Sequence, residues 1–414
     1  MRRANAEAIE KWLRKIDTYN STPGNGTTRV LFTEPELKSR EYVMKEMENI
    51  GLKVTQDAIG NIFGTLEGTD PSLSPVWTGS HIDTVLNAGM FDGMAGVVSG
   101  MEALKIIKES GEFHKRNIVV VVYTSEEPTR FELSCLGSRA MAGKLSLEDT
   151  KKLEDKDGNT LYGTLKDLGY DLNKYDDVKK NPGEVYAAVE LHIEQNDVLD
   201  KAGIPIGIVK GICAPTNYNV IIEGCQSHAG GTSMSERADA FAAASELALL
   251  TERLAKESKG EYVTATVGRV KVFPNAVNVI SGYTEISIDI RSIDLESKDI
   301  LISGLMKGVK EIEEKRNVKI HMKQENHDVP YKCDKHLVET LISHCESLHI
   351  PYRKLISGAY HDSLFTGCFT PTAMIFVPCR EGISHSRDEW AEFEDIAAGT
   401  DLLADTLLAL ANEE

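Results

Sequence analysis

One stretch of the chain decides the fold, Thr78-Gly-Ser-His-Ile-Asp-Thr-Val-Leu-Asn-Ala-Gly-Met-Phe-Asp-Gly-Met-Ala-Gly96. A short apolar strand ends at Gly79 and delivers His81 and Asp83 into a loop, and Asp92 follows between two glycines. A histidine and a nearby carboxylate are suitable ligands for a divalent cation, and Asp83 could orient the imidazole of His81. Taken alone, the stretch is equally compatible with a polar loop that caps a helix.

Three further apolar runs end at acidic residues or lead to histidines. The runs are 118–123, 185–191 and 373–377, and they lead to Glu126 and Glu127, to His192 and to His385, respectively. The continuous β-branched run at 118–123 is typical of a strand that is buried on both faces of a parallel sheet. Sites in open α/β sheets form beyond the carboxyl ends of the strands, so these residues are predicted to form one cluster.

Length, net charge and cysteine content limit the classes of protein to which this chain can belong. A chain of 414 residues exceeds the usual size of a single core, so we expect two domains. The net charge of −18 disfavours nucleic acid and anionic membranes as partners, and no apolar run is long enough for a membrane span. The N-terminal residues lack the apolar core of a signal peptide, and the seven cysteines show no close pair. We therefore expect a cytoplasmic protein.

Residues 213–329 have the pattern of an inserted domain. Alternating strands are predicted at 218–223, 263–272, 283–292 and 318–324, and helices at 235–257 and 299–315. The order β-α-β-β-α-β is the ferredoxin-like arrangement. The remaining segments, 1–212 and 330–414, would then form one discontinuous α/β domain with helices at 4–18, 34–51 and 97–110 and a hairpin at 54–66.

The residues at the strand ends have the chemistry of a two-metal site. The five candidate ligands are His81, Asp92, Glu127, His192 and His385. Imidazole and carboxylate together suit Zn²⁺ or Mn²⁺, and a shared carboxylate would give a dinuclear site. The additional carboxylate, Glu126, could then act as the general base.

The motifs resemble those of the two-metal aminoacylase and carboxypeptidase family, in the branch of the allantoate, ureidoglycolate and N-carbamoyl-L-amino-acid amidohydrolases. They are Gly79-Ser-His-Ile-Asp83, Phe91-Asp-Gly93, Ser125-Glu-Glu127, Glu190-Leu-His-Ile-Glu-Gln195, Ser227-His-Ala-Gly230, Pro274-Asn-Ala-Val-Asn278, Asp289-Ile-Arg291, Ala359-Tyr-His-Asp362 and Ser384-His385. The resemblance implies a zinc-peptidase-like catalytic domain, with a mixed, mostly parallel sheet flanked by helices, and an inserted dimerisation domain.

The resemblance also implies roles for individual residues. Asp92 would bridge two divalent ions per subunit, His81 and His192 would each hold one ion, and Glu127 and His385 would complete the ligand set. Glu126 would be the base, with Asp83 behind His81. His228, Asn278 and Arg291 would reach the substrate across a homodimer, and Gln195 would bond its ureido group. Further substrate-site candidates are Gly358, Tyr360 and His361.

Several of these residues also have a structural interpretation. His228 could be a loop residue bonded to backbone, Asn278 a turn residue, and Arg291 a solvated residue or salt-bridge partner. His361 could support the site without touching the substrate. Cys379, although close to His385 in the sequence, is best explained as a small buried apolar residue.

Two departures from the allantoate and carbamoyl enzymes bear on the substrate. They lie in the runs Glu126-Glu-Pro-Thr-Arg-Phe131 and Gly358-Ala-Tyr-His-Asp362, and Tyr360 stands where the related enzymes carry glycine. The first of these runs and Ala359-Tyr-His-Asp-Ser-Leu-Phe365 are similar to those of plant ureidoglycolate amidohydrolases. We expect hydrolysis of the carbamoyl C–N bond of a small ureido acid, with ureidoglycolate as the first candidate. The alternatives are a carbamoyl-amino-acid or allantoate amidohydrolase, an aminoacylase or dipeptidase, or a non-catalytic scaffold. The ligand set suits Mn²⁺, Zn²⁺, Co²⁺ and Ni²⁺ alike.

Overall fold

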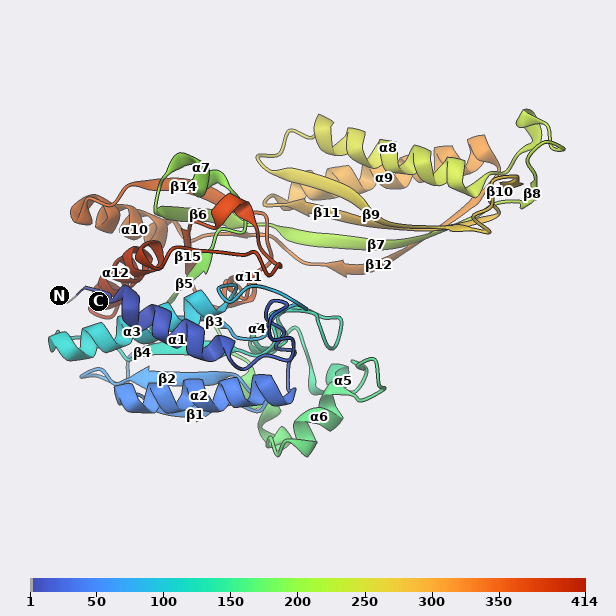
Figure 1. Ribbon diagram of the computed structural model, residues 1–414. Coiled ribbons are helices and arrows are strands. Elements are labelled where there is room, and N and C mark those ends of the chain that lie inside the picture. The colour runs from blue at the N-terminus through green and yellow to red at the C-terminus, as the bar shows by residue number, and fades with distance from the viewer. Residues whose placement is uncertain (1–2) are drawn as a thin grey trace. The chain divides into compact units, whose positions relative to one another are not determined.

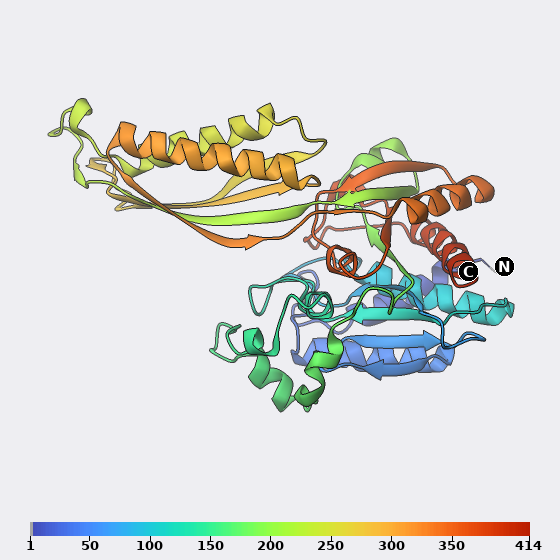
Figure 2. The ribbon, with the colours of Figure 1, turned by 180° about the vertical axis from the view of Figure 1, so that it is seen from behind.

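The computed structural model describes residues 3–414 and divides into two compact units (Figure 1; Figure 2). The first unit comprises the chain up to Lys210, together with Cys333–Ser357 and His361–Glu414. The second comprises Gly211–Lys332 and Gly358–Tyr360. The boundaries expected from the sequence are 212/213 and 329/330. Within the described residues, no helix has both the length and the apolar character that crossing a membrane requires.

Four parallel strands form the centre of the sheet in the first unit. In order across the sheet they are β4 (Ile118–Tyr123), β3 (Val76–His81), β5 (Ala187–Ile193) and β15 (Thr372–Val377). Every residue of all four strands is buried, which explains their nearly continuous apolar sequences. Because the strands are parallel, their carboxyl ends share one edge of the sheet, as the sequence predicted.

Antiparallel strands extend this sheet on both sides, so the predicted mixed, mostly parallel sheet is confirmed. On one side β2 (Ile62–Leu66) pairs with β4, and β1 (Lys53–Gln56) pairs with β2 as the expected hairpin. On the other side β6 (Ile206–Ile212) runs antiparallel to β15, and β14 (Tyr352–Ser357) pairs with β6.

Helix α3 (Met94–Ser110) fixes the position of the residue that precedes it, Asp92. The helix packs against β3, β4 and β5, and a Cβ atom on Gly96 would lie 2.3 Å from the carbonyl oxygen of Leu191. This close approach holds the N-terminal end of α3 at the edge of the sheet where the strands end. The expected helix start was Val97, and the structure places it three residues earlier, directly after Gly93.

The other helices of the first unit pack around α3 and the sheet. Helix α12 (Phe393–Leu410) packs on α3, while α1 (Ala6–Asp17) and α10 (Lys335–Leu348) pack on α12. Helix α2 (Glu34–Ile50) lies against β1 and β2. The short elements are α7 (Val198–Ala202), α11 (Ser363–Thr366) and the 3₁₀ turn η3 (Arg380–Gly382).

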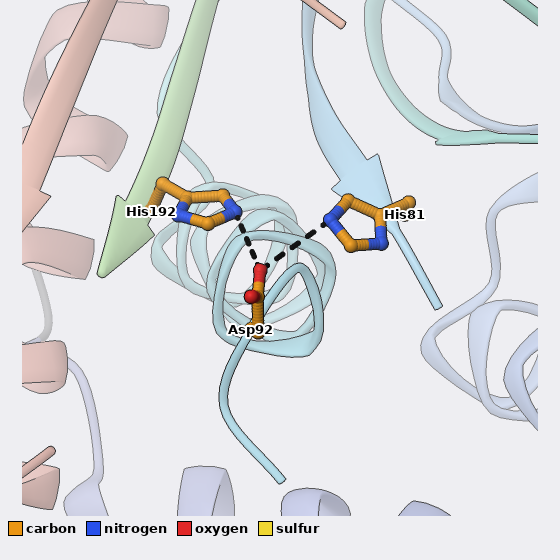
Figure 3. Close-up of side chains that lie close together, drawn as sticks. All are labelled: His81, Asp92 and His192. Atoms are coloured by element: carbon orange, nitrogen blue, oxygen red, sulfur yellow. Dashed lines mark ion pairs between the residues drawn. The ribbon is translucent and has the colours of Figure 1, made fainter. Parts of the chain in front are cut away.

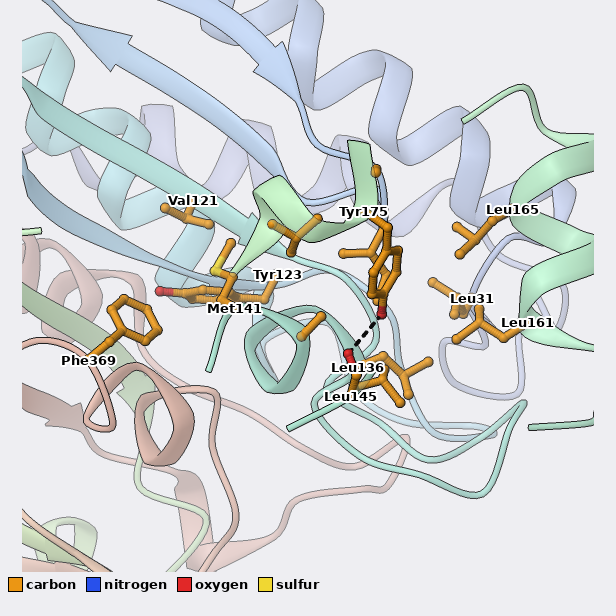
Figure 4. Packing of buried hydrophobic residues seen from close by; sticks show 14 of the residues in the cluster. Leu31, Val121, Tyr123, Leu136, Met141, Leu145, Leu161, Leu165, Tyr175 and Phe369 are labelled. Atoms are coloured by element: carbon orange, nitrogen blue, oxygen red, sulfur yellow. Dashed lines mark hydrogen bonds between the residues drawn. The ribbon is translucent and has the colours of Figure 1, made fainter. Parts of the chain in front are cut away.

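An apolar cluster covers the face of β4 that lies opposite helix α3 (Figure 4). Val121 and Tyr123 of β4 contribute to it, and the phenol of Tyr175 donates a hydrogen bond to the carbonyl oxygen of Leu145 at 3.3 Å. Short helices between β4 and β5 supply much of the rest. They are α4 (Leu136–Met141), α5 (Leu147–Thr150), α6 (Leu161–Asp167) and the 3₁₀ segment η1 (Leu172–Val178). These helices were not predicted, because helices of one or two turns carry too little periodicity to be recognised.

The second unit has the predicted β-α-β-β-α-β order. Its four-stranded antiparallel sheet contains β12 (Lys319–His327), β7 (Ala214–Glu223), β11 (Tyr283–Ser292) and β9 (Val263–Phe273), in this order across the sheet. Helices α8 (Ala240–Glu257) and α9 (Leu295–Arg316) pack together with the sheet around one apolar core. Both helices begin after an aspartate cap, Asp239 and Asp294, which places their starts away from the expected 235 and 299.

A two-stranded ribbon marks one end of the second unit. The ribbon pairs β8 (Ser227–His228) with β10 (Val279–Ile280), and it lies at the end of the sheet where β7 stops and β11 begins (Figure 1). A 3₁₀ turn, η2 (Met234–Glu236), follows β8. Near the opposite end of the unit, β13 (Tyr331–Lys332) pairs with the last residues of β6.

Candidate metal centre and substrate residues

Three histidines converge on the carboxylate of Asp92. The Nε2 atoms of His192 and His81 lie 3.2 and 3.6 Å from Asp92 Oδ1 (Figure 3). The Nε2 atom of His385 lies 3.1 Å from Asp92 Oδ2. His81, Asp92 and His192 are buried, whereas the side chain of His385 is 49% exposed. The predicted cluster therefore forms around a single carboxylate.

The backbone fixes which nitrogen of each buried imidazole carries a proton. Nδ1 of His81 lies 3.0 Å from the carbonyl oxygen of Asp83, and Nδ1 of His192 lies 2.9 Å from that of Ile193. A carbonyl only accepts hydrogen bonds, so each Nδ1 must be the donor. In the neutral rings both Nε2 atoms then direct lone pairs at Asp92. Two acceptors in this arrangement repel each other unless a cation or a proton lies between them.

The donor set fits a divalent cation. The Nε2 atom of His192 is buried and has no hydrogen-bond partner among the described residues. Neutral imidazoles held through Nδ1 by a carbonyl are the usual form of metal-binding histidines. The hydrogen bond to Asp92 raises the pKa of His385 to about 9, against the opposing effect of its burial.

Asp92 belongs to two groups of candidate ligands. One comprises His81, Asp92 and His192, and the other comprises Asp92, Glu127 and His385. Within each group the ligand atoms all lie within 4.8 Å of one another. Burial, followed by the charge of Asp92, raises the pKa of Glu127 to about 7. The geometry thus provides places for two cations with one shared carboxylate.

A third group, which contains Glu190, His192 and His361, has a different character. Both oxygens of Glu190 already accept hydrogen bonds, from the hydroxyls of Ser80 and Ser363. His361 is buried, its Nε2 bonds the hydroxyl of Ser357 at 2.9 Å, and burial lowers its pKa well below the ordinary value. Its ring stands edge-on to His192 at 4.6 Å between centroids. This packing supports the interpretation that His361 stabilises the position of His192, which is a candidate metal ligand.

Asp83 supports the site in more ways than the sequence predicted. Its carbonyl, and not its carboxylate, accepts the hydrogen bond from His81, because the carboxylate lies 3.7 Å from that nitrogen. The carboxylate oxygens instead accept hydrogen bonds from the backbone N–H groups of Glu126 and Glu127, at 3.2 and 3.0 Å. One aspartate thereby orients a histidine on one strand end and two glutamates on the next.

Glu126 lies beside the ligand groups without belonging to either. Its Oε2 atom is 4.0 Å from Nε2 of His81, and the thiol of Cys135 contacts its Oε1 atom at 3.6 Å. Only 8% of the residue is exposed. Burial, followed by the charge of Glu127, raises its pKa well above the usual range. A carboxylate in this position can exchange a proton with a small molecule bound at the cluster.

The loops that carry Asp92 and His385 contain contacts that the sequence did not reveal. The side-chain amide of Gln195 donates to Asp92 Oδ2 at 2.9 Å, and its own Oε1 has no hydrogen-bond partner within residues 3–414. The hydroxyl of Ser384 lies between two carboxylates, 3.2 Å from Asp92 Oδ2 and 2.9 Å from Glu389 Oε2, and can donate its proton to either. No sequence signal distinguishes Glu389 from the other acidic residues between 381 and 395. Only the fold shows that Glu389 lies at the site, through its hydrogen bond with Ser384.

Gly93 lies against the ring of His81, and this contact yields a prediction. Gly93 has φ of +72°, and a Cβ atom there would lie 2.5 Å from the His81 imidazole. Gly93→Ala should lose about 1–3 kcal/mol of stability, because φ of +72° with ψ of −49° is a backbone conformation that alanine rarely adopts. The added methyl group should also displace His81, which would weaken metal binding. Thermal unfolding and a Mn²⁺ titration measure the two effects.

Gly111, at the other end of α3, provides the control for this substitution. It also has positive φ, at +66°, but no atom lies within 4 Å of its added Cβ. Gly111→Ala should therefore lose about 1–2 kcal/mol of stability from its left-handed conformation and retain the affinity for Mn²⁺. Equal Mn²⁺ affinities in the two variants would contradict the assignment of His81 as a ligand.

His228, in the second unit, is bonded to the backbone through Nδ1, and no hydrogen bond to its Nε2 is found among the described residues. Its Nδ1 accepts hydrogen bonds from the N–H groups of Gly230 and Gly231, both at 3.1 Å. The neutral ring therefore carries its proton on Nε2, where it can be donated outward. Asn278 lies beside this loop, because its carbonyl accepts from the N–H of Ala229 at 2.9 Å.

Arg291 and Tyr360 also lie in the second unit, and both already have partners. Arg291 donates from Nε to Asp289 at 2.9 Å and from Nη1 to the carbonyl of Gly358 at 2.8 Å. The phenol of Tyr360 donates to the carboxylate of Asp328. The proton of this phenol is thus engaged by Asp328.

The structure does not bring Arg291 close to His228 and Asn278. Tyr283, at the start of β11, pairs with Glu223 beside the β8–β10 ribbon, whereas Arg291 pairs with Pro215 at the other end of the strand. At a rise of about 3.3 Å per residue, Tyr283 and Arg291 are about 26 Å apart. One small molecule cannot contact both ends of this strand.

Comparisons with known proteins identify the family. Residues 77–409 match the model of peptidase family M20/M25/M40. The chain is 38% identical to a ureidoglycolate hydrolase of Arabidopsis thaliana, over 98% of this chain and 87% of the relative. It is 35% identical to an N-carbamoyl-L-amino-acid amidohydrolase of Pseudomonas sp. strain NS671, over 97% of both. The crystal structure of AtUAH in complex with glyoxylate superposes with a TM-score of 0.85 at 37% identity, covering 99% of this chain and 98% of that one. The family predicted from the motifs is thereby confirmed, and the chain belongs to peptidase family M20/M25/M40.

Proposed function

We propose that this protein is a metal-dependent amidohydrolase that cleaves the carbamoyl C–N bond of ureidoglycolate. The observation that carries the proposal is the convergence of His81, His192 and His385 on Asp92, with the buried carboxylate of Glu126 beside them. The choice of substrate is supported by the plant relative named for ureidoglycolate, which is similar over nearly the whole chain.

Two divalent ions would be held by the two groups that share Asp92. His81 and His192 would hold one ion, and Glu127 and His385 the other. Mn²⁺ or Zn²⁺ fits these ligands, as do Co²⁺ and Ni²⁺. When bound, such ions supply Lewis acidity that polarises the ureido carbonyl. Removal of metal with a chelator should abolish turnover, and added Mn²⁺ should restore it.

Glu126 is the proposed general base. It would accept a proton from the water that attacks the ureido carbonyl and deliver it to the leaving nitrogen as the C–N bond breaks. The released carbamate decomposes to carbon dioxide and ammonia. The hydroxylated amine left behind loses a second ammonia and becomes glyoxylate. Asp83 maintains the position of the base through the backbone N–H of Glu126.

The second unit is the proposed source of further substrate contacts, of which that of His228 would come from a partner subunit. Arg291 would bind the substrate carboxylate, and Nε2–H of His228 would stabilise the developing oxyanion. These two residues lie near opposite ends of β11, so one substrate molecule can use both only if they come from different subunits. This separation supports a homodimer in which the second unit is the dimerisation domain.

A cytoplasmic location is part of the proposal. All seven cysteines are free in the structure, as expected for a protein in a reducing compartment.

Substrate selectivity provides the test of the proposed function. Ureidoglycolate bears a hydroxyl on its α-carbon, where carbamoyl amino acids bear a side chain and allantoate a second ureido group. The phenol of Tyr360, which donates to Asp328, would limit the room for a large substituent and would bond that hydroxyl. A site that bonds a hydroxyl discriminates strongly against analogues without it. We expect kcat/KM to be highest for ureidoglycolate. In Tyr360→Gly the ratio of kcat/KM for ureidoglycolate to that for allantoate or N-carbamoyl-methionine should become smaller.

The measurement is ammonia release from ureidoglycolate, allantoate and N-carbamoyl-methionine at equal enzyme and Mn²⁺ concentrations. Tyr360→Phe is the matched variant, because it keeps the ring and removes only the oxygen. It should lose preference for ureidoglycolate while still excluding allantoate. If N-carbamoyl-methionine is the fastest substrate of the wild-type protein, the carbamoylase alternative replaces ureidoglycolate.

A further inference from the structure

One buried carboxylate, that of Glu389, connects the two loops that carry candidate metal ligands. Its Oε1 atom accepts hydrogen bonds from the backbone N–H groups of Phe91 and Asp92, both at 3.0 Å. Its Oε2 atom accepts the hydroxyl of Ser384, the residue before His385, at 2.9 Å. Only 4% of Glu389 is exposed. Each of its oxygens therefore holds a different loop.

The packing around Glu389 leaves its carboxylate little freedom. The ring of the next residue, Trp390, stands edge-on to Phe91 with centroids 5.3 Å apart. On another side, a Cβ atom on Gly89 would lie 2.4 Å from both Cβ and Oε1 of Glu389. Hydrogen bonds and close packing thus fix the carboxylate against the segment 89–92.

We propose that Glu389 is a positioning residue for metal binding. It acts through the backbone of Asp92, which belongs to both ligand groups, and through Ser384, which precedes His385. Without it the two loops lose their common support, and Asp92 is held less firmly between the two cation positions. This inference rests on the metal site of the proposed function. Removing a group that orients metal ligands typically weakens metal affinity by about 10–100-fold.

Metal titration tests this role in the absence of substrate. The apo protein is prepared by chelation and titrated calorimetrically with Mn²⁺. Glu389→Ala should bind Mn²⁺ about 10–100-fold more weakly than wild type. Glu389→Gln should bind nearly as well as wild type, because its amide oxygen can accept from the two N–H groups while its amide nitrogen donates to Ser384. At saturating Mn²⁺ the KM for ureidoglycolate should be unchanged in both variants, since both oxygens of Glu389 are bonded to Phe91, Asp92 and Ser384 and the residue is not a proposed substrate contact.

Gly89→Ala provides an independent variant that retains the carboxylate. Its added methyl group would displace Glu389, so its Mn²⁺ affinity should fall as in Glu389→Ala. Glu102→Ala is the control for the loss of a buried carboxylate. Glu102 is 1% exposed on α3 and bonds Lys105 and the N–H of Asn5, but no candidate ligand. Glu102→Ala should lose thermal stability and keep its Mn²⁺ affinity.

The outcomes separate this inference from the proposed function. Wild-type affinity for Mn²⁺ in Glu389→Ala would overturn the positioning role and leave the metal proposal intact. Equal weakening in Glu389→Ala and Glu102→Ala would overturn it as well, because general destabilisation would then account for the loss. Failure of the wild-type protein to bind Mn²⁺ would overturn the metal site and the role of Glu389 together. The preference for ureidoglycolate is measured separately and does not depend on these titrations.

Discussion

Glu126→Gln is expected to retain its metal and to lose about 100-fold to 10,000-fold in kcat, the usual range for the loss of a general acid or base. Glutamine has nearly the same shape as glutamate, and the backbone N–H of residue 126 can still bond Asp83. The side chain belongs to neither ligand group, so the ligands remain in place. What the variant lacks is a group that can accept a proton.

Glu127→Gln is the matched control for this prediction. The two glutamates are adjacent and buried, and both donate a backbone N–H to Asp83. Only Glu127 belongs to a ligand group, with Asp92 and His385. Glu127→Gln should therefore lose metal affinity, and Asp92→Ala should lose it more completely. Elemental analysis and ammonia release at saturating Mn²⁺ measure the two properties. The assignment is reversed if Glu126→Gln is purified without metal and Asp92→Ala with a full complement.

Mixing two inactive variants is expected to restore activity. If His228 acts on the active site of the partner subunit, a dimer of one Glu126→Gln and one His228→Ala chain contains one site with both residues intact. Random exchange makes half of the dimers mixed, and each has one working site of two, so activity should reach about a quarter of wild type. The separation of Arg291 and His228 along β11 supports the proposal that His228 acts on the partner's site, and the recovery tests it.

A pair of variants with defects in the same unit provides the control. Glu126 and Asp92 both lie in the first unit, so a mixture of Glu126→Gln and Asp92→Ala should remain inactive. Subunit exchange is verified by native mass spectrometry in both mixtures. If the His228→Ala mixture exchanges but gains no activity, His228 works within its own subunit or takes no part in the reaction.

Much of the first unit could be predicted from the sequence because local patterns there are strong. Residues 118–123 form an apolar β-branched run, and a strand buried on both faces is the structure that such a run favours. Parallel strands bring their carboxyl ends to one edge, so His81, Glu126 and His192 were predicted to lie together without knowledge of any distance. The order of strands and helices in the second unit could also be predicted, because its alternating strands and its helices have clear hydrophobic patterns.

The functions of single side chains were harder to predict because they depend on contacts between distant parts of the chain. The carboxylate of Asp83 binds the backbone of Glu126 and Glu127, although its place in the sequence suggested a bond to His81. Tyr360 donates its hydroxyl proton to Asp328. The short helices between β4 and β5 were missed because they are stabilised by packing on β4 and not by their own periodicity.

By itself, the sequence determined the class of fold, the inserted unit and the chemical character of the cluster at the strand ends. These features follow from hydrophobic periodicity and residue type, which are local properties of the chain. Only the tertiary structure decided that three histidines face one carboxylate, which ring nitrogen of His81 and His192 carries the proton, and that Glu389 binds two loops almost 300 residues apart in the chain. Such contacts depend on where hydrogen-bond donors and acceptors meet in space, and that is fixed by the packing of the whole unit.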